Sequence, residues 1–386
     1  MDKDYVGVSA FGLKLGAITP EVDLKEEVMN LLKRCREDNM IHDGDVLCVT
    51  ESVLARSQNN FVTVDEVVEE LHEKHGINEN YTLLVQFPIT SRNRFSAILR
   101  ALARSVKNGR VIVQQSYPSD EVGNQVVEGE LENDQLYRYE DIKNNQDLDF
   151  NHPITGINYL EFYEDIINEE MADHEIYLCN DPQALISEDI DAVIVSSIHR
   201  RRQDKLAVIE KAKKLSKFIE VMDLTSIFND DEDRSRWGLL GSNLSAGEKI
   251  KLAPTRPFEF AEELKRSIGE ELDRDVEVII YGDGAYKDPE SGIYELADPV
   301  TSFGFTAGLE NRIRKGNKYK YLVDKYVSEG YEQEEIERMI REEDVEAEDE
   351  GTTPRKAKDL ISSLADLVSG SADAGTPLVL VKNFFD

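Results

Sequence analysis

The chain has 386 residues, of which 40% are hydrophobic and 32% charged, and its formal net charge is −33. This length suffices for two or three domains. So acidic a chain is unsuited to broad binding of nucleic acids or anionic membrane surfaces, both of which favour basic proteins. No run of 18 apolar residues occurs and the first residues lack the pattern of a secretory signal, so we expect neither a membrane span nor secretion.

The three cysteines are Cys35, Cys48 and Cys179, and none forms a CxxC pair. An odd number without metal-ligand spacing argues against structural disulfides and zinc sites, and it predicts a reducing, cytoplasmic location. Cys48 lies inside an apolar run, which is typical of a small buried hydrophobic side chain rather than a nucleophile.

Short runs rich in Val, Ile or Leu, bounded by turn-forming residues, predict β-strands. In chain order, these runs are residues 46–50, 81–87, 111–115, 192–196, 276–281 and 377–382. Apolar residues at helical spacing predict helices between the strands. The predicted helices are residues 24–39, 63–75, 95–106, 207–221, 258–272 and 356–368. The helix that begins after residue 63 opens with a capping-box sequence.

This mixture predicts an α+β or mixed α/β fold. The strands are not spaced regularly enough for a simple Rossmann count, and neither GxGxxG nor GxxxxGK[ST] occurs, so standard dinucleotide and P-loop binding are not supported. We expect a main region at residues 1–350, with an internal border near 150–250. The acidic run at residues 332–350 is typical of a solvated helix entering a loop, and a helix–loop–strand unit at residues 351–386 is expected to pack on the main region.

Three oxygen-bearing side chains, Asp120, Glu121 and Asn124, lie in the loop that follows the strand at residues 111–115. Carboxylate and amide oxygens at a strand's carboxyl end suit Mg²⁺ or Mn²⁺. The alternative is an ordinary polar turn. The sequence therefore makes these three residues candidate metal ligands.

A second acidic turn follows the strand at residues 276–281, where Asp283 has a glycine on each side and Lys287 comes shortly afterwards. Glycines let the backbone approach a ligand closely. The alternative is a simple hairpin turn. Asp120 and Asp283 are far apart in the sequence, and we expect them to meet at one metal centre.

Two basic clusters stand out in so acidic a chain. Their members are Arg200, Arg201 and Arg202 after the strand at residues 192–196, and Arg92 and Arg94 at the start of a helix. Arginine binds phosphate or carboxylate in a bidentate manner. Basic residues oppose the dipole at a helix N-terminus, which favours a ligand-binding role over a solvated helix start.

The small residues between the last predicted helix and strand include Ser371 and Thr376. Their backbone N–H groups are suited to an anion-binding nest, and the alternative is a flexible connection.

Several segments resemble the gamma-glutamyl ligases of deazaflavin coenzyme F420 biosynthesis. Residues 43–56 are similar to that family's "GDVLVVTEKVVSK" opening, and residues 278–283 to its "VIISDT" strand end. A longer bacterial branch is the better match, because its phrases SYPSDEVGN, YGDGAxKDP, ELADPV, TTPR and SGSxDxGTP all occur here. The chain departs from the family pattern at Ser52, where a lysine is usual, and at Gly284, where a threonine is usual.

The resemblance implies a GTP-dependent ligase that joins L-glutamate to an acidic acceptor through an acyl phosphate, with Mg²⁺ or Mn²⁺. It implies Asp120, Asn124 and Asp283 as metal-site residues. Together with the residues singled out above, the candidates are Asp120, Asp283 and Lys287 for catalysis and Asp120, Glu121, Asn124 and Asp283 for metal binding. The five arginines, Ser371 and Thr376 would contact phosphate or substrate. It also implies an intertwined homodimer. The alternatives are another metal-dependent, phosphate-handling enzyme on the same scaffold, and a non-catalytic nucleotide-binding protein.

Overall fold

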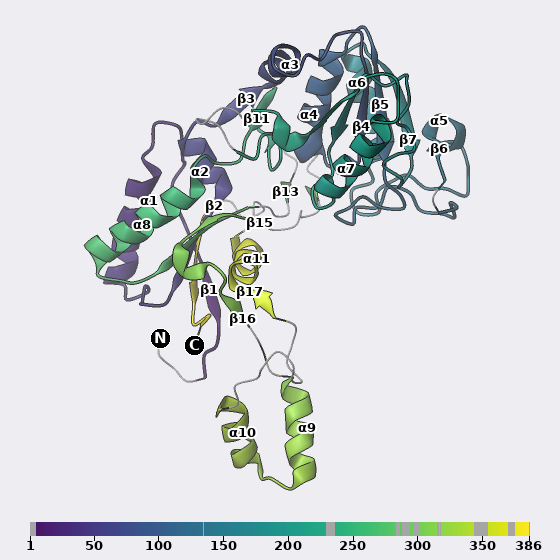
Figure 1. Ribbon diagram of the computed structural model, residues 1–386. Coiled ribbons are helices and arrows are strands. Elements are labelled where there is room, and N and C mark those ends of the chain that lie inside the picture. The colour runs from purple at the N-terminus through teal and green to yellow at the C-terminus, as the bar shows by residue number, and fades with distance from the viewer. Residues whose placement is uncertain are drawn as a thin grey trace.

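The computed structural model describes residues 5–133, 135–228, 236–282, 286–287, 294–295, 301–314, 316, 318–342, 354–369 and 375–385. Two sheets organise the fold, one of five strands and one of six, and each has its own hydrophobic core. We call the parts built on them the five-stranded domain and the parallel domain (Figure 1).

The five-stranded domain draws its strands from the beginning, the middle and the end of the chain. In sheet order they are β1 (Ser9–Leu13), β18 (Leu378–Lys382), β2 (Val46–Thr50), β12 (Glu277–Gly282) and β15 (Thr301–Phe305). Strands β2 and β12 are parallel, and the other pairs are antiparallel. Alternate residues of these strands face opposite sides. One side packs against α1 (Leu24–Glu37) and α8 (Pro257–Leu272), and the other against α11 (Ala357–Ser369).

The parallel domain has the strand order β6-β7-β5-β4-β8-β9. The strands are β4 (Thr82–Gln86), β5 (Arg110–Gln115), β6 (Tyr137–Arg138), β7 (Asp173–Leu178), β8 (Ala192–Val195) and β9 (Glu220–Asp223). All but β6 run parallel. From β4 the chain proceeds outward through β5 to β7, and then returns to build β8 and β9 on the other side. This order makes a doubly wound sheet with its switch point between β4 and β8.

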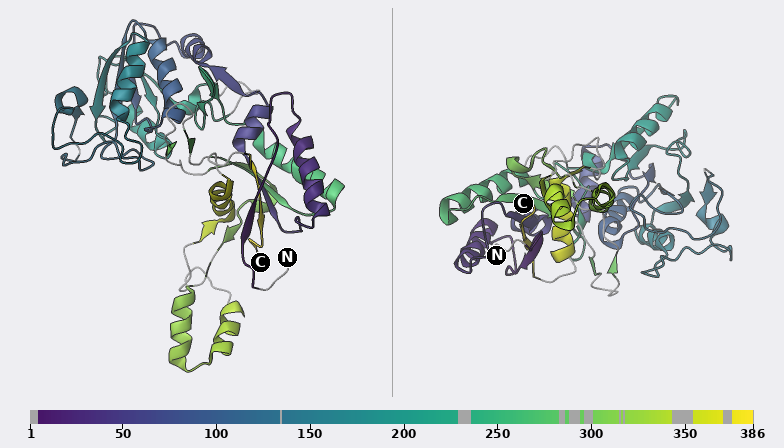
Figure 2. Two further views of the ribbon diagram at one scale, coloured as in Figure 1. Left: turned by 180° about the vertical axis from the view of Figure 1, so that it is seen from behind. Right: turned by 90° about the horizontal axis from the view of Figure 1, so that it is seen from below.

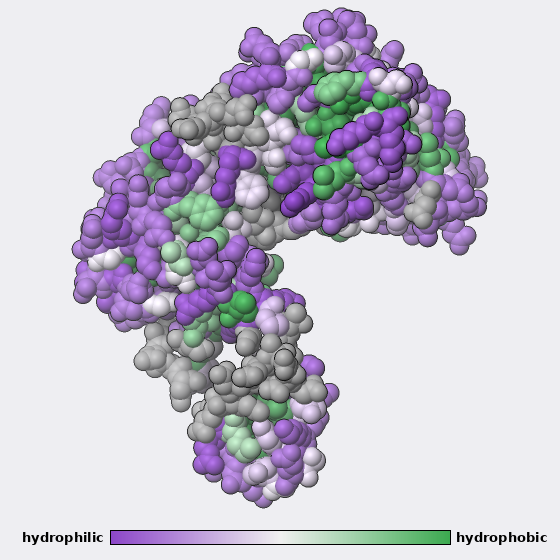
Figure 3. Space-filling model, viewed as in Figure 1, coloured by the Kyte–Doolittle hydropathy of each residue, from purple (hydrophilic) through white to green (hydrophobic). Residues whose placement is uncertain are grey.

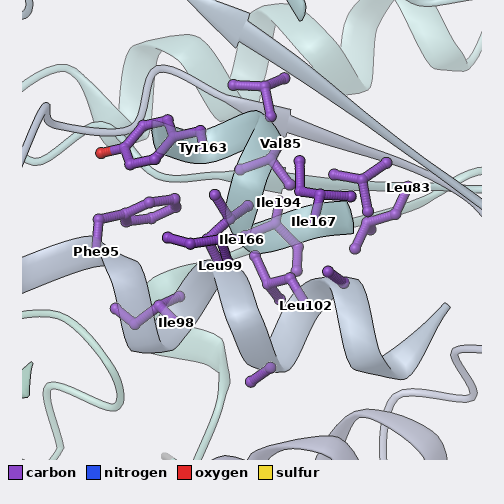
Figure 4. Close-up of a cluster of buried hydrophobic side chains, with 14 of the residues drawn as sticks. Leu83, Val85, Phe95, Ile98, Leu99, Leu102, Tyr163, Ile166, Ile167 and Ile194 are labelled. Carbon is purple, nitrogen blue, oxygen red and sulfur yellow. The ribbon is translucent and has the colours of Figure 1, made fainter. Parts of the chain in front are cut away.

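Helices cover both faces of the parallel sheet. They are α4 (Arg92–Ser105) and α6 (Tyr159–Glu169) on one face, and α7 (Arg201–Ala212) on the other. Figure 4 shows how α4 is held in place: Phe95, Leu99 and Leu102 face Tyr163 and its neighbours on α6. Burial of each such side chain contributes about 1.5–3 kcal/mol. The N-terminus of α4 is therefore fixed by a large apolar contact.

Smaller elements join and extend the two domains. The helix α2 (Glu51–Ser57) packs on the five-stranded domain, and α3 (Val64–Glu73) packs on α4 of the parallel domain. Between the domains lies the small sheet of β3 (Phe61–Thr63), β10 (Asn243–Leu244) and β11 (Lys249–Lys251) (Figure 1). Further short elements are α5 (Tyr139–Ile142), η1 (Leu224–Ser226), η2 (Ala307–Leu309), and the pairs β13 (Tyr286–Lys287) with β14 (Tyr294–Glu295) and β16 (Ile313–Arg314) with β17 (Arg355–Lys356). A helical hairpin, α9 (Tyr319–Glu329) and α10 (Gln333–Glu342), extends away from both domains (Figures 1 and 2).

The mixed α+β class is confirmed, and all six predicted strands are present: β2 has the predicted bounds, and the ends of the other five differ by at most one residue. A helix is present where residues 207–221 were predicted helical, but the predicted bounds are wrong, because α7 spans Arg201–Ala212 and β9 begins at Glu220. The doubly wound order was not visible in the strand spacing, since the connection from β7 to β8 contains no helix. Residues 351–386 were expected to pack on the main region. In the structure α11 packs on one side of the five-stranded sheet, and β18 is one of the inner strands of that sheet.

The molecular face seen in Figure 3 is mainly hydrophilic, as the net charge of −33 leads one to expect. Across the described residues, each helix is too short or too polar to cross a membrane.

Candidate active site: a cleft between the two domains

A cleft of about 660 Å³ lies where the two domains meet. The side chains and backbone that line it include Glu51, Arg56, Asn93, Arg94, Lys251 and Gly282. Ligand sites of this size commonly form at domain interfaces. The cleft is thus a candidate site for the ligands of the protein.

The floor of the cleft is built at the carboxyl ends of two neighbouring parallel strands. In the register of β2 and β12, Thr50 is paired with Tyr281. Glu51 therefore leaves β2 beside Gly282, the last residue of β12. A Cβ atom on Gly282 would lie only 2.3 Å from Glu51 Cγ, so this close approach requires glycine. Asp283, the predicted metal ligand, follows Gly282 in the chain but lies outside the described residues.

A buried ion pair lies at the floor of the cleft. Lys251 Nζ donates to Glu51 Oε2 over 2.7 Å, and the two side chains are 4% and 5% exposed, respectively. The sequence analysis missed both residues, although Glu51 falls in the segment that carries the family resemblance. Glu51 comes directly after an apolar strand, and that position was the available signal.

The N-terminus of α4 forms the opposite wall. Ser91 caps this helix by accepting the backbone N–H of Arg94 over 3.1 Å. Asn93 and Arg94 line the cleft, whereas Arg92 lines an adjoining cavity of about 360 Å³ and stacks over the Phe162 ring, 5.5 Å from its centroid. Both arginines of this cluster therefore face ligand-sized cavities.

Asp120 is tied to that helix start through Thr90. Its Oδ2 accepts the Thr90 backbone N–H (2.9 Å), the Thr90 hydroxyl (2.8 Å) and the Asn124 amide (3.0 Å). Its Oδ1 accepts the backbone N–H groups of Val122 (3.1 Å) and Asn124 (2.8 Å). The carboxylate is 5% exposed and holds five hydrogen bonds. It thus anchors the loop after β5 to the residue that precedes the cap of α4.

Glu121 points to the other side of the same loop. Its carboxylate accepts the backbone N–H groups of Ile198, His199 and Arg200, which lead into α7. Asp120, Glu121, His199 and Arg200 line a further cavity of about 420 Å³. A carboxylate at this position satisfies N–H groups at a helix start that would otherwise suit an anion.

The arginine triplet has divided roles. Arg200 Nη2 lies 3.3 Å from Asp204 Oδ1, and Arg201 Nε lies 3.8 Å from Asp223 Oδ1. Arg202 is exposed in the first turn of α7. Two of the three guanidinium groups are therefore close to carboxylates of their own domain.

The remaining predicted residues lie at or beyond the edge of the cleft. Thr376 is buried, and its carbonyl accepts the hydroxyl of Ser369. Ser369, Gly375 and Pro377 line the cleft. Ser371 and the side chain of Lys287 lie outside the described residues, as Asp283 does. The expected meeting of Asp120 with Asp283 stays a prediction.

The described part of the chain holds no group of three or more His, Cys, Asp or Glu side chains arranged to bind a metal ion. Asp120 and Glu121 are engaged in hydrogen bonds, and the glycine-flanked Asp283 is not described. Metal binding by Asp120, Glu121, Asn124 and Asp283 therefore stays a prediction.

Taken together, the fold and the cleft define a mixed α/β protein of two domains with a polar site between them. The family described as F420-0:Gamma-glutamyl ligase matches residues 12–383. The chain belongs to this family of ligases, as its motifs led us to expect.

No curated protein matches the sequence. Among solved structures, a universal stress protein from Archaeoglobus fulgidus aligns with 39% of this chain and 98% of its own, at 16% identity and a TM-score of 0.21. A likeness at that score supports no conclusion about either fold or function.

Proposed function

We propose that the protein is a metal- and GTP-dependent amide ligase that joins L-glutamate to an acidic acceptor, the precursor form of coenzyme F420. The observation that carries the proposal is the cleft of about 660 Å³, which has basic side chains on both walls and lies within a chain of the gamma-glutamyl ligase family. The resemblance extends the proposal to a cytoplasmic homodimer.

The chemistry requires two transfers. An oxygen of the acceptor carboxylate attacks the γ-phosphorus of GTP, and GDP leaves. The amine of glutamate then attacks the resulting acyl carbon, inorganic phosphate leaves, and the amide remains after the amine loses its proton. Phosphoryl transfer of this kind depends mainly on positioning and charge stabilisation by the protein.

The walls of the cleft offer groups for that task. Arg56 and Arg94 come from opposite walls, and guanidinium groups bind phosphate oxygens in pairs. Gly375 and Pro377, the neighbours of Thr376, line the cleft, which supports a phosphate contact by this part of the chain. Ser371, earlier in the same connection, is proposed to take part. Arg92 and Arg200 line neighbouring cavities suited to an anionic substrate.

A bound Mg²⁺ or Mn²⁺ would neutralise phosphate charge. Asp283 is the proposed ligand nearest in sequence to the floor of the cleft, with Asp120, Glu121 and Asn124 as further candidates. Glu51 is added to this set because its side chain lies beside Gly282, the residue that precedes Asp283. Lys287 is proposed to act on the reacting groups from the segment after Asp283.

The test is GDP release and amide formation with purified protein, GTP, Mn²⁺, L-glutamate and the coenzyme precursor. Amide formation and sustained GDP release over many turnovers should require all four. Arg94→Ala should raise the KM for GTP about tenfold or more, since a charge-assisted hydrogen bond contributes about 1.5–3 kcal/mol. Lys33→Ala, at an exposed surface pair, is the control. Tight GTP binding without turnover would favour a non-catalytic nucleotide-binding protein. Metal-dependent turnover of other phosphate compounds would favour another metal-dependent, phosphate-handling enzyme on the same scaffold.

A further inference from the structure

A second, smaller cavity lies at the switch point of the parallel sheet. Ile89, from the loop after β4, and Ser196, directly after β8, both line it. These two strands are neighbours, yet the chain leaves them toward opposite edges of the sheet. In open α/β sheets, ligands bind outside the carboxyl ends of the strands at such a point. We call this cavity the switch-point pocket.

The walls of the switch-point pocket are mainly apolar, and they include three large aromatic side chains. Phe95, Trp237 and Phe303 line it, and the last two rings meet edge to face at 5.5 Å between centroids. The volume is about 80 Å³, which is room for one ring rather than for a whole nucleoside. Flat aromatic walls favour a flat, aromatic occupant.

Two hydroxyl groups in the pocket have no hydrogen-bond partner among the described residues. They belong to Ser196 and Ser242, each 2% exposed. The next residue, Ser197, shows the contrast, because its hydroxyl donates to Asp204 over 2.9 Å. Buried polar groups in folded proteins are almost always satisfied. Two unsatisfied hydroxyls in one cavity therefore point to a ligand that supplies their partners.

The pocket lies next to the larger cleft, and the two cavities share Arg94 in their walls. A ligand ring placed in the pocket could therefore extend an anionic tail past this guanidinium group into the cleft. Such a ligand is flat at one end and negatively charged at the other.

We propose that the switch-point pocket receives the hydrogen-bonding edge of a planar heteroaromatic ring, with the hydroxyls of Ser196 and Ser242 as its partners. The inference rests on the proposed function only for the source of the ring. A guanine base and the deazaflavin ring of the acceptor both carry an edge with hydrogen-bond donors and acceptors, which a serine hydroxyl can match in either role.

Trp237 makes the proposal measurable, because it is the single tryptophan of the chain and lines the pocket. Its fluorescence is followed while the protein is titrated with GTP in one arm and with an 8-hydroxy-5-deazaflavin riboside in the other. One of the two should change the emission, and the responding arm identifies the source of the ring. Calorimetric titration of the same pairs excludes inner-filter artefacts.

Ser196→Ala and Ser242→Ala should each weaken binding of the responding ligand about threefold to tenfold, the effect of one hydrogen bond. The melting temperature of the ligand-free variants should stay level or rise, because an unsatisfied hydroxyl is removed. Ser105→Ala is the matched control: that serine is buried in α4 and its hydroxyl donates to the Leu102 carbonyl over 2.7 Å. It should lower the melting temperature and leave binding unchanged.

Two results would overturn the proposal: no response of Trp237 to either ligand, or unchanged affinity in both serine variants. Failure of the proposed function gives a different result. A protein that shows no amide formation but binds one ring in a serine-dependent way keeps the pocket and loses the ligase. An active ligase with indifferent serine variants keeps the ligase and loses the pocket.

Discussion

Lys251 and Glu51, 200 positions apart in the chain, form a buried ion pair with 2.7 Å between Nζ and Oε2. Lys251 ends β11 in the small sheet between the domains, and Glu51 begins α2 at the end of β2. The pair therefore joins the connecting sheet to the floor of the cleft, beside Gly282.

Replacement of one partner should be costly. Lys251→Met leaves the Glu51 carboxylate buried without its counter-charge, and the free energy of unfolding should fall by about 3–5 kcal/mol. The double variant Glu51→Gln with Lys251→Met should recover most of that loss. Urea denaturation measures both. Lys33→Met removes an exposed pair and should cost less than about 1 kcal/mol. If Lys251→Met and Lys33→Met lowered the free energy of unfolding equally, the Lys251–Glu51 pair would not act as a buried ion pair that stabilises the fold.

Gly282→Ala tests how tightly the floor is packed. The new Cβ would lie 2.3 Å from Glu51 Cγ and 2.6 Å from Phe303 Cε2, so the strand end must shift. We expect a loss of about 1–3 kcal/mol, typical of overpacking, together with reduced ligase turnover. Thermal unfolding and the product assay give the two values. Gly7→Ala places its Cβ in open space and serves as the control. An unperturbed Gly282→Ala protein would show that the floor is looser than the structure indicates.

Thr90→Val separates positioning by Asp120 from metal binding by Asp120. The valine keeps the shape of the side chain and removes one hydrogen bond to the carboxylate, so stability should fall by about 1 kcal/mol. If Asp120 acts by holding the start of α4, affinity for GTP should fall as well, measured by calorimetry without added metal. GTP affinity that changes only in Asp120→Asn, and only when Mn²⁺ is present, would instead assign Asp120 to the metal.

The pH dependence of stability should carry a contribution from His152. Burial lowers the pKa of this imidazole, and its Nδ1 accepts the N–H groups of Ile154 (3.3 Å) and Thr155 (3.2 Å). The unfolded chain therefore binds a proton at higher pH than the folded chain. Neutral His152 therefore makes its full contribution to the free energy of unfolding above the ordinary histidine pKa of about 6.5. This contribution is lost as the pH falls from there through the lower pKa of the folded state.

His152→Asn keeps a hydrogen-bond acceptor and removes the titration. Its free energy of unfolding, measured in urea at several pH values, should fall less steeply between about pH 7 and 5 than that of the unmodified protein. A slope remains, because burial also lowers the pKa of His42. Identical slopes in the two proteins would show that His152 does not contribute.

Local patterns were sufficient for many elements. The capping box at the start of α3 is present as predicted: the Thr63 hydroxyl accepts the Glu66 backbone N–H, and the Glu66 carboxylate accepts that of Thr63. Apolar runs marked the six strands for the same reason, since each depends on residues within one segment. The strand β7 escaped notice because Asp173, His174 and Glu175 hide its alternation.

The candidate site was only partly visible. Arg92 and Arg94, which the sequence singled out for ligand binding, do line ligand-sized cavities. Glu51 and Lys251 were found only in the structure, where the pairing of β2 with β12 and the position of β11 bring them together. No local sequence pattern shows that two residues 200 positions apart form a hydrogen-bonded ion pair.

From the sequence alone came the acidic, mixed α/β character, the family motifs and most of the helices and strands, because these depend on composition and on neighbours a few residues away. Tertiary structure alone decided the doubly wound order, the placement of β18 inside the first sheet and the cleft. It also decided the burial of the Ser196 and Ser242 hydroxyls without hydrogen-bond partners among the described residues. The physical reason is that burial and strand pairing depend on contacts between segments far apart in the chain, and those contacts exist only once the whole chain has folded.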